Sequence, residues 1–137
     1  MKFRGEYSFL SNFFVSAFQY KTYVFSTAEH AYQASKAIYE EEFHLIRLAK
    51  SPSEAKKMGK RIEIRKDWSS VKLKVMKQVL DEKFSNPELA RKLIAVNIPI
   101  IEENEWGDTF WGVCNGKGEN HLGKILSRIR QEKMIFN

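Results

Sequence analysis

The chain has 137 residues, of which 43% are hydrophobic and 29% charged, a balance typical of a folded globular protein. This length suits one compact domain, so we expect residues 1–137 to form a single domain. The formal net charge of +6 favours anionic partners, in particular compounds that carry phosphate. Charge alone does not separate small phosphates from nucleic acid.

The sequence lacks the features of a secreted or membrane-spanning protein. It begins with charged residues, contains a single cysteine, Cys114, and has no apolar run long enough to cross a bilayer. We therefore expect a cytoplasmic protein that makes no contact with a membrane.

The first elements expected along the chain are a strand and a helix. Residues 20–25 are rich in aromatic and β-branched side chains, which is typical of a strand. Ser26 followed by Glu29 has the form of a capping box, which predicts a helix start. Apolar side chains then recur at helical spacing as far as Tyr39, so we expect a core-facing helix to that residue.

Further helices are predicted by their capping residues. Residues 51–54 and 86–88 each place Ser or Asn before a proline and a glutamate, the pattern of a helix start. Asp67 can cap another helix, whose apolar face extends to Phe84. The last helix is expected from about Asn120.

Two short segments between these helices have the character of strands. Residues 62–64 alternate like a strand, and residues 98–101 resemble an edge strand or an extended entry segment. The expected fold is therefore a helix-rich α+β domain with a few short strands.

Glycine is concentrated near the C-terminus. Five of the seven glycines lie at positions 107, 112, 116, 118 and 123. Because glycine allows positive φ and close backbone approach, this segment is the best candidate to fold around a ligand.

Several common chemistries are disfavoured by the motifs. The segment Gly112–Gly118 lacks the spacing and the Ser or Thr of a P-loop, and His121 breaks a dinucleotide-binding fingerprint. The three histidines and one cysteine have no metal-ligand spacing, and no serine lies in a nucleophile elbow. We expect no metal and no cofactor.

Two segments carry residues suited to catalysis or binding. In the first predicted helix, Glu29, Gln33 and Lys36 are spaced to share one polar stripe, with side chains that can converge. The alternatives are that Glu29 only caps the helix and that Lys36 is solvated. The second segment, residues 103–112, holds two tryptophans and Asp108 beside glycines. Its indoles suit base stacking, or they fill the core, and Trp68 poses the same choice.

Five blocks of this sequence together resemble the NADAR (YbiA-like) family. They occur in order over nearly the whole chain. The blocks are Phe9–Phe14 (FLSNFF), Thr27–Ala37 (TAEHAYQASKA), Arg65–Trp68 (RKDW), Asp108–Gly112 (DTFWG) and Gly118–Gly123 (GENHLG). The resemblance implies the NADAR fold and the activity of an N-glycosidase, a hydrolase that cleaves the bond between a ribose anomeric carbon and a nitrogen.

The resemblance implies two substrate classes. One is the phosphoribosylamino-pyrimidine intermediates of riboflavin synthesis, and the other is ADP-ribose attached to guanine in DNA or RNA. A non-catalytic module that binds ADP-ribose or a related nucleotide is the alternative.

The resemblance also implies site residues by their positions in the blocks. Active-site roles fall to Glu29, Trp68, Asp108 and Trp111, with Lys36, Asn12 and Asn120 close by. We expect Glu29, Lys36 and Asp108 to be catalytic. The remaining substrate-binding candidates from these blocks are Phe13, Tyr32, Gln33, Gly112 and Gly118.

Two mechanisms are compatible with these residues. Departure of the base builds positive charge at the anomeric carbon, so Glu29 or Asp108 could stabilise it while the other carboxylate activates water. Alternatively, Lys36 could displace the base by forming a Schiff base, which needs a partly neutral amine. Both mechanisms assume that the Glu29 helix and the Asp108 loop meet around one sugar.

Overall fold

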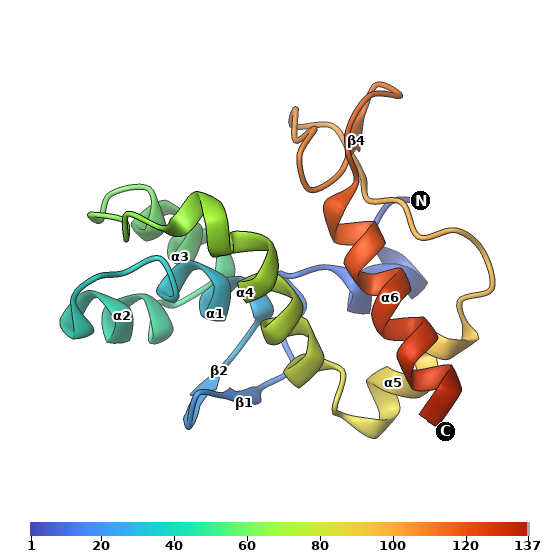
Figure 1. The fold of residues 1–137 in the computed structure, drawn as a ribbon, viewed down its shortest axis with the longest axis horizontal. Helices are drawn as coiled ribbons and strands as arrows, with labels where there is room; N and C mark the ends of the chain where they lie inside the picture. Colours follow the sequence, from blue (N-terminus) through green and yellow to red (C-terminus); the bar gives the residue numbers. More distant parts are fainter. Residues whose placement is uncertain (137) are drawn as a thin grey trace. The chain divides into compact units, whose positions relative to one another are not determined.

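The computed structural model describes residues 1–136, and its contacts divide the chain into two compact units, which we describe one at a time (Figure 1). The middle unit spans Asn12–Lys83. The terminal unit consists of Met1–Ser11 and the chain from Phe84 onward. The predicted helix-rich α+β fold is confirmed, because six α-helices within the described residues accompany only two-stranded pairings.

The middle unit contains one antiparallel strand pair and four α-helices. Their bounds are β1 (Phe18–Tyr20), β2 (Tyr23–Phe25), α1 (Ala28–Ala34), α2 (Glu40–Arg47), α3 (Pro52–Gly59) and α4 (Trp68–Lys83). Helix α1 contacts α2, α3 and α4, and all seven of its residues are buried. Polar side chains on α1 are therefore held inside this unit rather than in solvent.

The terminal unit contains a 3₁₀ helix, two α-helices and a very short strand pair. Their bounds are η1 (Gly5–Leu10), α5 (Pro87–Ala95), β3 (Glu103–Asn104), β4 (Val113–Cys114) and α6 (His121–Phe136). Strands β3 and β4 pair in parallel. Helices α5 and α6 contact each other, with Leu89, Leu93, Leu126 and Ile129 among the buried side chains.

The helix starts predicted from proline are confirmed. Ser51 accepts a hydrogen bond from the Glu54 amide at the start of α3, and Asn86 accepts bonds from the first turn of α5. Helix α4 begins directly after Asp67, and α6 begins one residue after Asn120. A short polar side chain at each capped end replaces the partners that the first backbone amides lack.

The first helix starts at Ala28, as predicted, but its capping residue and its C-terminal end differ from the prediction. Thr27, not Ser26, is the N-cap, and its hydroxyl accepts a hydrogen bond from the His30 amide (3.1 Å). The helix ends at Ala34, and Tyr39 is 56% exposed instead of facing the core. The chain turns after Ser35, whose hydroxyl donates to the Ala31 carbonyl, and a second helix, α2, begins at Glu40.

The strand predictions were only partly right. Residues 20–25 do not form one strand but run from the end of β1 through a turn into β2, because Lys21 and Thr22 adopt φ of 51° and 69°. Of residues 62–64, only Ile64 pairs, through a single bridge to Ala37. Residues 98–101 run as a connection between α5 and β3.

No helix within the described residues is long and apolar enough to cross a membrane.

Candidate active site

Glu29 is a buried carboxylate in the middle unit and is only 7% exposed. Its Oε2 accepts a hydrogen bond of 2.6 Å from Gln33 Nε2, one helical turn further along α1. The cap of this helix is Thr27, so Glu29 does not have the capping role that its sequence position suggested. A carboxylate inside a protein is costly unless it is hydrogen-bonded, and Gln33 supplies one such bond.

Lys36 follows α1 and lies in the turn after it, so it does not extend the helical stripe predicted from the sequence. Its amide donates to the Gln33 carbonyl (3.2 Å), which returns the chain toward the helix end. Its Nζ lies 5.5 Å from the centre of the Tyr32 ring, and Tyr32 stands 5.1 Å from the Trp68 ring. The turn therefore brings Lys36, Tyr32 and Trp68 together at the start of α4.

The Lys36 ammonium is in an environment that favours its neutral form. Burial lowers the pKa of Lys36 below the usual 10.5, and the nearby charges of Lys56, Lys60 and Lys72 lower it further. The Glu29 carboxylate acts in the opposite direction. The Glu29 carboxylate and the Lys36 amine are therefore near enough to influence each other, and their catalytic roles stay predictions.

The contacts between helices explain how three lysines surround Lys36. Helix α3 approaches α1 at Gly59, which lies against the Gln33 side chain. Lys56 lies three residues before that glycine, and Lys60 directly follows it. Lys72 lies one turn after Trp68 on α4. Neither Lys56 nor Lys60 forms an ion pair with the described residues. The result is a local excess of positive charge.

Asn12 and Phe13 lie where the chain enters this region. The Asn12 carbonyl accepts from the Glu29 amide (3.0 Å), and its side-chain Nδ2 lies 3.5 Å from Met76 Sδ. Its Oδ1 is buried and accepts no hydrogen bond from the described residues, which leaves an acceptor for a ligand. Phe13 is 40% exposed.

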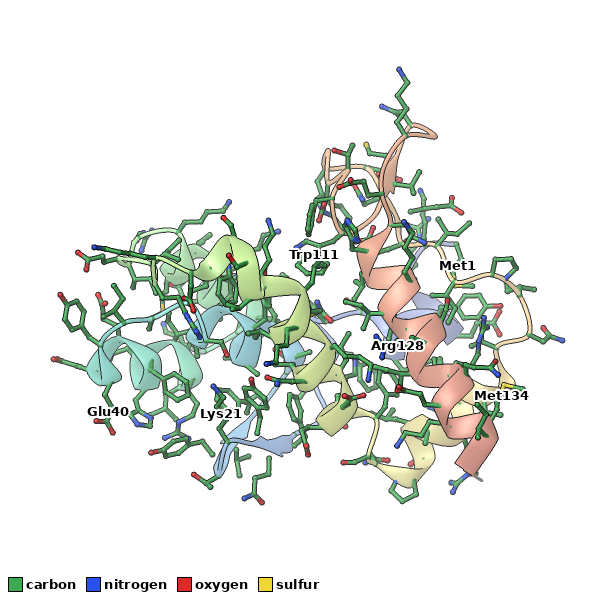
Figure 2. The ribbon with its side chains drawn as sticks, viewed as in Figure 1. Met1, Lys21, Glu40, Trp111, Arg128 and Met134 are labelled. Atoms are coloured by element: carbon green, nitrogen blue, oxygen red, sulfur yellow. The ribbon has the colours of Figure 1, made fainter. Side chains whose placement is uncertain are left out.

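In the terminal unit, Asp108 organises the loop between β3 and β4. Its Oδ1 accepts from the Phe110 amide (3.1 Å) and the Trp111 amide (2.9 Å). Trp111, which is labelled in Figure 2, is half-buried. Its ring stands edge-on to the Phe110 ring, with the two ring centres 4.9 Å apart. Asp108 was predicted to be catalytic, and one of its carboxylate oxygens therefore fixes the backbone conformation at Trp111.

Asn104 and Glu102 support this loop. Asn104 lies in the segment 103–112 that was singled out from the sequence, but neither residue was predicted to have a role. Asn104 is buried, and its Nδ2 donates to Glu102 Oε2 (2.9 Å) and to the Asp108 carbonyl (2.8 Å). A side chain at Gly112 would collide with Glu102 and lie 2.8 Å from Asn104 Nδ2. Gly112 is therefore required by packing. Only the density of glycines pointed to such a close approach.

Asn120 and Gly118 also shape the terminal unit. Asn120 adopts φ of 55°, and its side chain donates to the Ile100 carbonyl (3.0 Å) and accepts from the Glu102 amide (2.9 Å). Gly118 has φ of 152°, and a side chain there would collide with the Gly112 carbonyl. Both residues fix the backbone around the Asp108 loop.

Replacing Asp108 by asparagine separates the structural role of this side chain from the role of its charge. Asn retains an oxygen that can accept from the Phe110 and Trp111 amides, so the unfolding temperature should stay close to that of the wild type. Asp108→Ala removes the acceptor and should cost about 1–3 kcal/mol. Loss of activity with an unchanged unfolding curve in Asp108→Asn would assign a role to the charge. Full activity in Asp108→Asn would mean that the Asp108 side chain only stabilises the turn.

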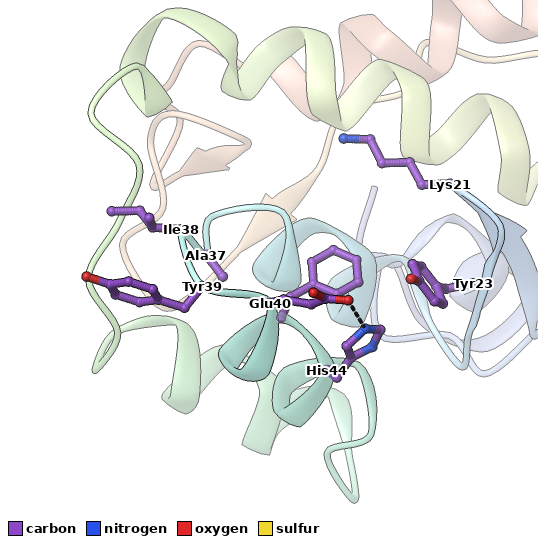
Figure 3. A pocket seen from close by; sticks show the side chains of 8 residues that line it. Lys21, Tyr23, Ala37, Ile38, Tyr39, Glu40 and His44 are labelled. Atoms are coloured by element: carbon purple, nitrogen blue, oxygen red, sulfur yellow. Dashed lines mark ion pairs between the residues drawn. The ribbon is translucent and has the colours of Figure 1, made fainter.

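A separate hollow of about 310 Å³ lies in the middle unit (Figure 3). It is formed by the β1–β2 hairpin, the turn after α1 and the first half of α2, and none of the predicted site residues lines it. Figure 3 shows Glu40 facing His44, with Glu40 Oε1 at 3.7 Å from His44 Nε2. This hollow was not predicted from the sequence, because helix α2, which forms part of its wall, was not predicted either.

Neither unit, over residues 1–136, gathers three His, Cys, Asp or Glu side chains that could hold a metal ion. The middle unit brings together Glu29, Gln33, Lys36, Tyr32 and Trp68. The terminal unit brings together the predicted residues from Asp108 to Asn120. The expectation that the two sets meet around one sugar stays a prediction.

Comparison with known families identifies the family to which this helix-rich chain belongs. The chain belongs to the NADAR family, whose domain profile matches residues 2–133. This confirms the resemblance carried by the five sequence blocks.

Individual relatives support the enzyme class. The N-glycosidase YbiA of Shigella flexneri serotype 5b is 35% identical over 135 residues, covering 95% of this chain and 84% of its own. The NMR structure of the E. coli protein YbiA matches with a TM-score of 0.88 and 33% identity, covering 99% of this chain and 85% of that one. The chloroplastic riboflavin biosynthesis protein PYRR of Zea mays is 34% identical over 124 residues, which cover 80% of this chain and 20% of the maize protein. The predicted class, a hydrolase acting on N-glycosyl bonds, is confirmed through the relatives named N-glycosidases.

Proposed function

We propose that this protein is an N-glycosidase that releases an amino-linked base from a ribose, and that Glu29 and Lys36 carry the chemistry. The observation that carries the proposal is the pairing of a buried, hydrogen-bonded carboxylate with a lysine whose pKa is lowered by burial. Perturbed titratable groups of this kind concentrate at active sites. The relatives named N-glycosidases supply the reaction class.

The substrate that we propose is a phosphoribosylamino-pyrimidine of riboflavin synthesis. The maize relative is named as a riboflavin biosynthesis protein, which favours this class. Three lysines near Lys36 add positive charge that suits a phosphate-bearing substrate. ADP-ribosylated guanine in DNA or RNA is the second candidate, because it too carries phosphate and an exocyclic amine on the anomeric carbon.

In the proposed mechanism, the sugar ring first opens. The lone pair of the exocyclic nitrogen forms a C1′=N bond while the C1′–O4′ bond breaks, and O4′ takes up a proton. The neutral Lys36 amine then adds to C1′. Proton transfer to the base nitrogen follows, the bond from C1′ to that nitrogen breaks, and the free amino base leaves. This sequence produces an imine between Lys36 and C1′.

Water completes the cycle. It adds to C1′ of the cationic imine, and one of its protons passes to the lysine nitrogen. The C1′–N bond then breaks while the remaining hydroxyl proton passes to Glu29, which restores neutral Lys36 and releases the ribose as an aldehyde that recloses. We assign to Glu29 the proton transfers and the stabilisation of the cationic imine. If Lys36 does not attack C1′, the alternative mechanism is direct attack on C1′ by water activated by Glu29 or Asp108.

The other predicted residues are proposed to bind substrate. Tyr32 and Trp68 offer aromatic surface beside Lys36, and Asn12 offers an unused buried acceptor. Trp111 is proposed as a stacking platform, held by the Asp108 turn. Phe13, Gly112, Gly118 and Asn120 complete the proposed set. Gln33 was predicted together with them, but its side-chain amide donates to Glu29.

A release assay tests the function. The protein is incubated separately with the phosphoribosylamino-pyrimidine intermediates and with a guanine oligonucleotide that carries ADP-ribose, and free base and free sugar are measured by mass spectrometry. We expect catalytic release from the pyrimidine intermediates. Binding without release from either compound would instead identify a non-catalytic nucleotide-binding module.

A further inference from the structure

The contact between Gln33 and Gly59 links helix α3 to the proposed catalytic carboxylate. Gln33 is 4% exposed, and its amide nitrogen donates to Glu29. Its amide oxygen is buried and accepts no hydrogen bond from the described residues. Gly59 is also buried, and a methyl group built there would overlap that oxygen and lie 2.9 Å from the amide carbon.

The backbone conformation at position 59 does not require glycine. It is the last residue of α3 and does not adopt positive φ. In such a helical position alanine is favoured over glycine by about 0.5–1 kcal/mol. The space that Gly59 leaves is filled by the Gln33 amide, so the absence of a side chain here serves the placement of Gln33.

We infer that Gln33 is a positioning residue that holds Glu29, and that Gly59 holds Gln33 in turn. This assignment rests on the proposed function, and it differs from the substrate-binding role predicted for Gln33. The donated bond holds Oε2 of Glu29, so the Gly59 contact on another helix contributes to the position of the carboxylate. An amide donor also stabilises the ionised carboxylate in a buried environment.

Gly59→Ala is the decisive variant because it changes neither Glu29 nor Gln33. The added methyl should displace the Gln33 amide and lower kcat about tenfold or more, the range for losing a hydrogen bond to a charged group. KM should stay within about twofold, since substrate contacts remain. Lys57→Ala, at an exposed position on the same helix, is the matched control and should behave as the wild type.

A double-mutant cycle tests the link between the two residues. Gln33→Ala should lower kcat to a similar extent, and adding Gly59→Ala to it should cost almost nothing more, because the displaced group is already gone. Additive losses would overturn the inference. A raised KM with unchanged kcat in Gln33→Ala would also overturn it, because that result identifies a substrate-binding residue.

A second readout requires no turnover. The side-chain amide protons of Gln33 in ¹H–¹⁵N NMR spectra should shift on Glu29→Ala and on Gly59→Ala, but not on Lys57→Ala. Unchanged Gln33 signals in Gly59→Ala would contradict the inference even if the protein released no base. A wild-type protein without base release, but with these shifts, would refute the proposed function alone. If Gly59→Ala does not fold, the kcat and KM of Gln33→Ala decide whether Gln33 positions Glu29 or binds substrate.

Discussion

Lys36→Ala should reduce base release at least about a thousandfold, the scale of loss when a covalent nucleophile is removed. Sodium borohydride added to the wild type during turnover should reduce the imine and attach the sugar to Lys36, detected as a mass increase on the peptide that contains it. Lys36→Arg is the matched control, because it keeps the positive charge but cannot form the imine. It should be as inactive as Lys36→Ala.

Two results would contradict the imine mechanism. Substantial activity in Lys36→Arg, together with no adduct in the wild type, would reduce Lys36 to an electrostatic role and favour direct attack by water. Loss of activity in both variants without an adduct would equally count against the imine.

The pH dependence of turnover gives a second test of the same residue. Only the neutral amine attacks C1′, so the rate should rise as pH increases through the pKa of Lys36. Because burial and three neighbouring lysines lower this pKa, the rise should be complete at a lower pH than for an ordinary lysine. Lys60→Gln removes one lowering charge and should move the rise to higher pH. Lys57→Gln, which lies outside this group, should leave it in place.

Glu29→Gln should lower kcat at least about a hundredfold while the protein stays folded. The substituted amide retains an oxygen that can accept from Gln33 Nε2, so packing inside α1 is largely preserved. What is lost is the charge that stabilises the cationic imine and the group that transfers protons. Single-turnover release assays and thermal unfolding should be measured on the same preparation.

Thr27→Ala provides the control for Glu29→Gln. Thr27 is the actual N-cap of α1, so this change should cost about 1 kcal/mol of unfolding free energy and leave kcat nearly unchanged. Near-normal turnover in Glu29→Gln with a similar loss of stability would mean that the carboxylate is structural.

The parts of the fold predicted from the sequence are those encoded by local chemistry. The starts of α3 and α5 depend on one polar cap and one proline each, and both were predicted. The end of α1 was not, because the apolar spacing continues past Ala34 to Tyr39 while the chain does not. The Ser35 hydroxyl bond and the bridge from Ala37 to Ile64 form only in the folded unit.

In the candidate site, too, features set by the local sequence were predicted, whereas contacts between distant residues were not. Glu29, Gln33 and Lys36 were predicted to share one side of a helix. Glu29 and Gln33 do so and are hydrogen-bonded, whereas Lys36 lies in the turn after the helix, close enough for the Glu29 charge to affect its pKa. The role of Gly59 was not predictable, because its neighbour Gln33 is 26 positions away and only the packing of α3 on α1 brings them together. Likewise, nothing in the local sequence around Asp108 indicates that Glu102 and Asn104 brace its loop.

The complete burial of α1 affects how mutational surveys of this family should be interpreted. A helix without a solvent-facing side gives every one of its seven positions a reason to be intolerant of change, whether or not the residue touches substrate. Growth-based selection would therefore score His30, which bonds to Thr27 and Ala49, as severely as Glu29. Only when the abundance of each variant is measured alongside its turnover would the two kinds of intolerance separate.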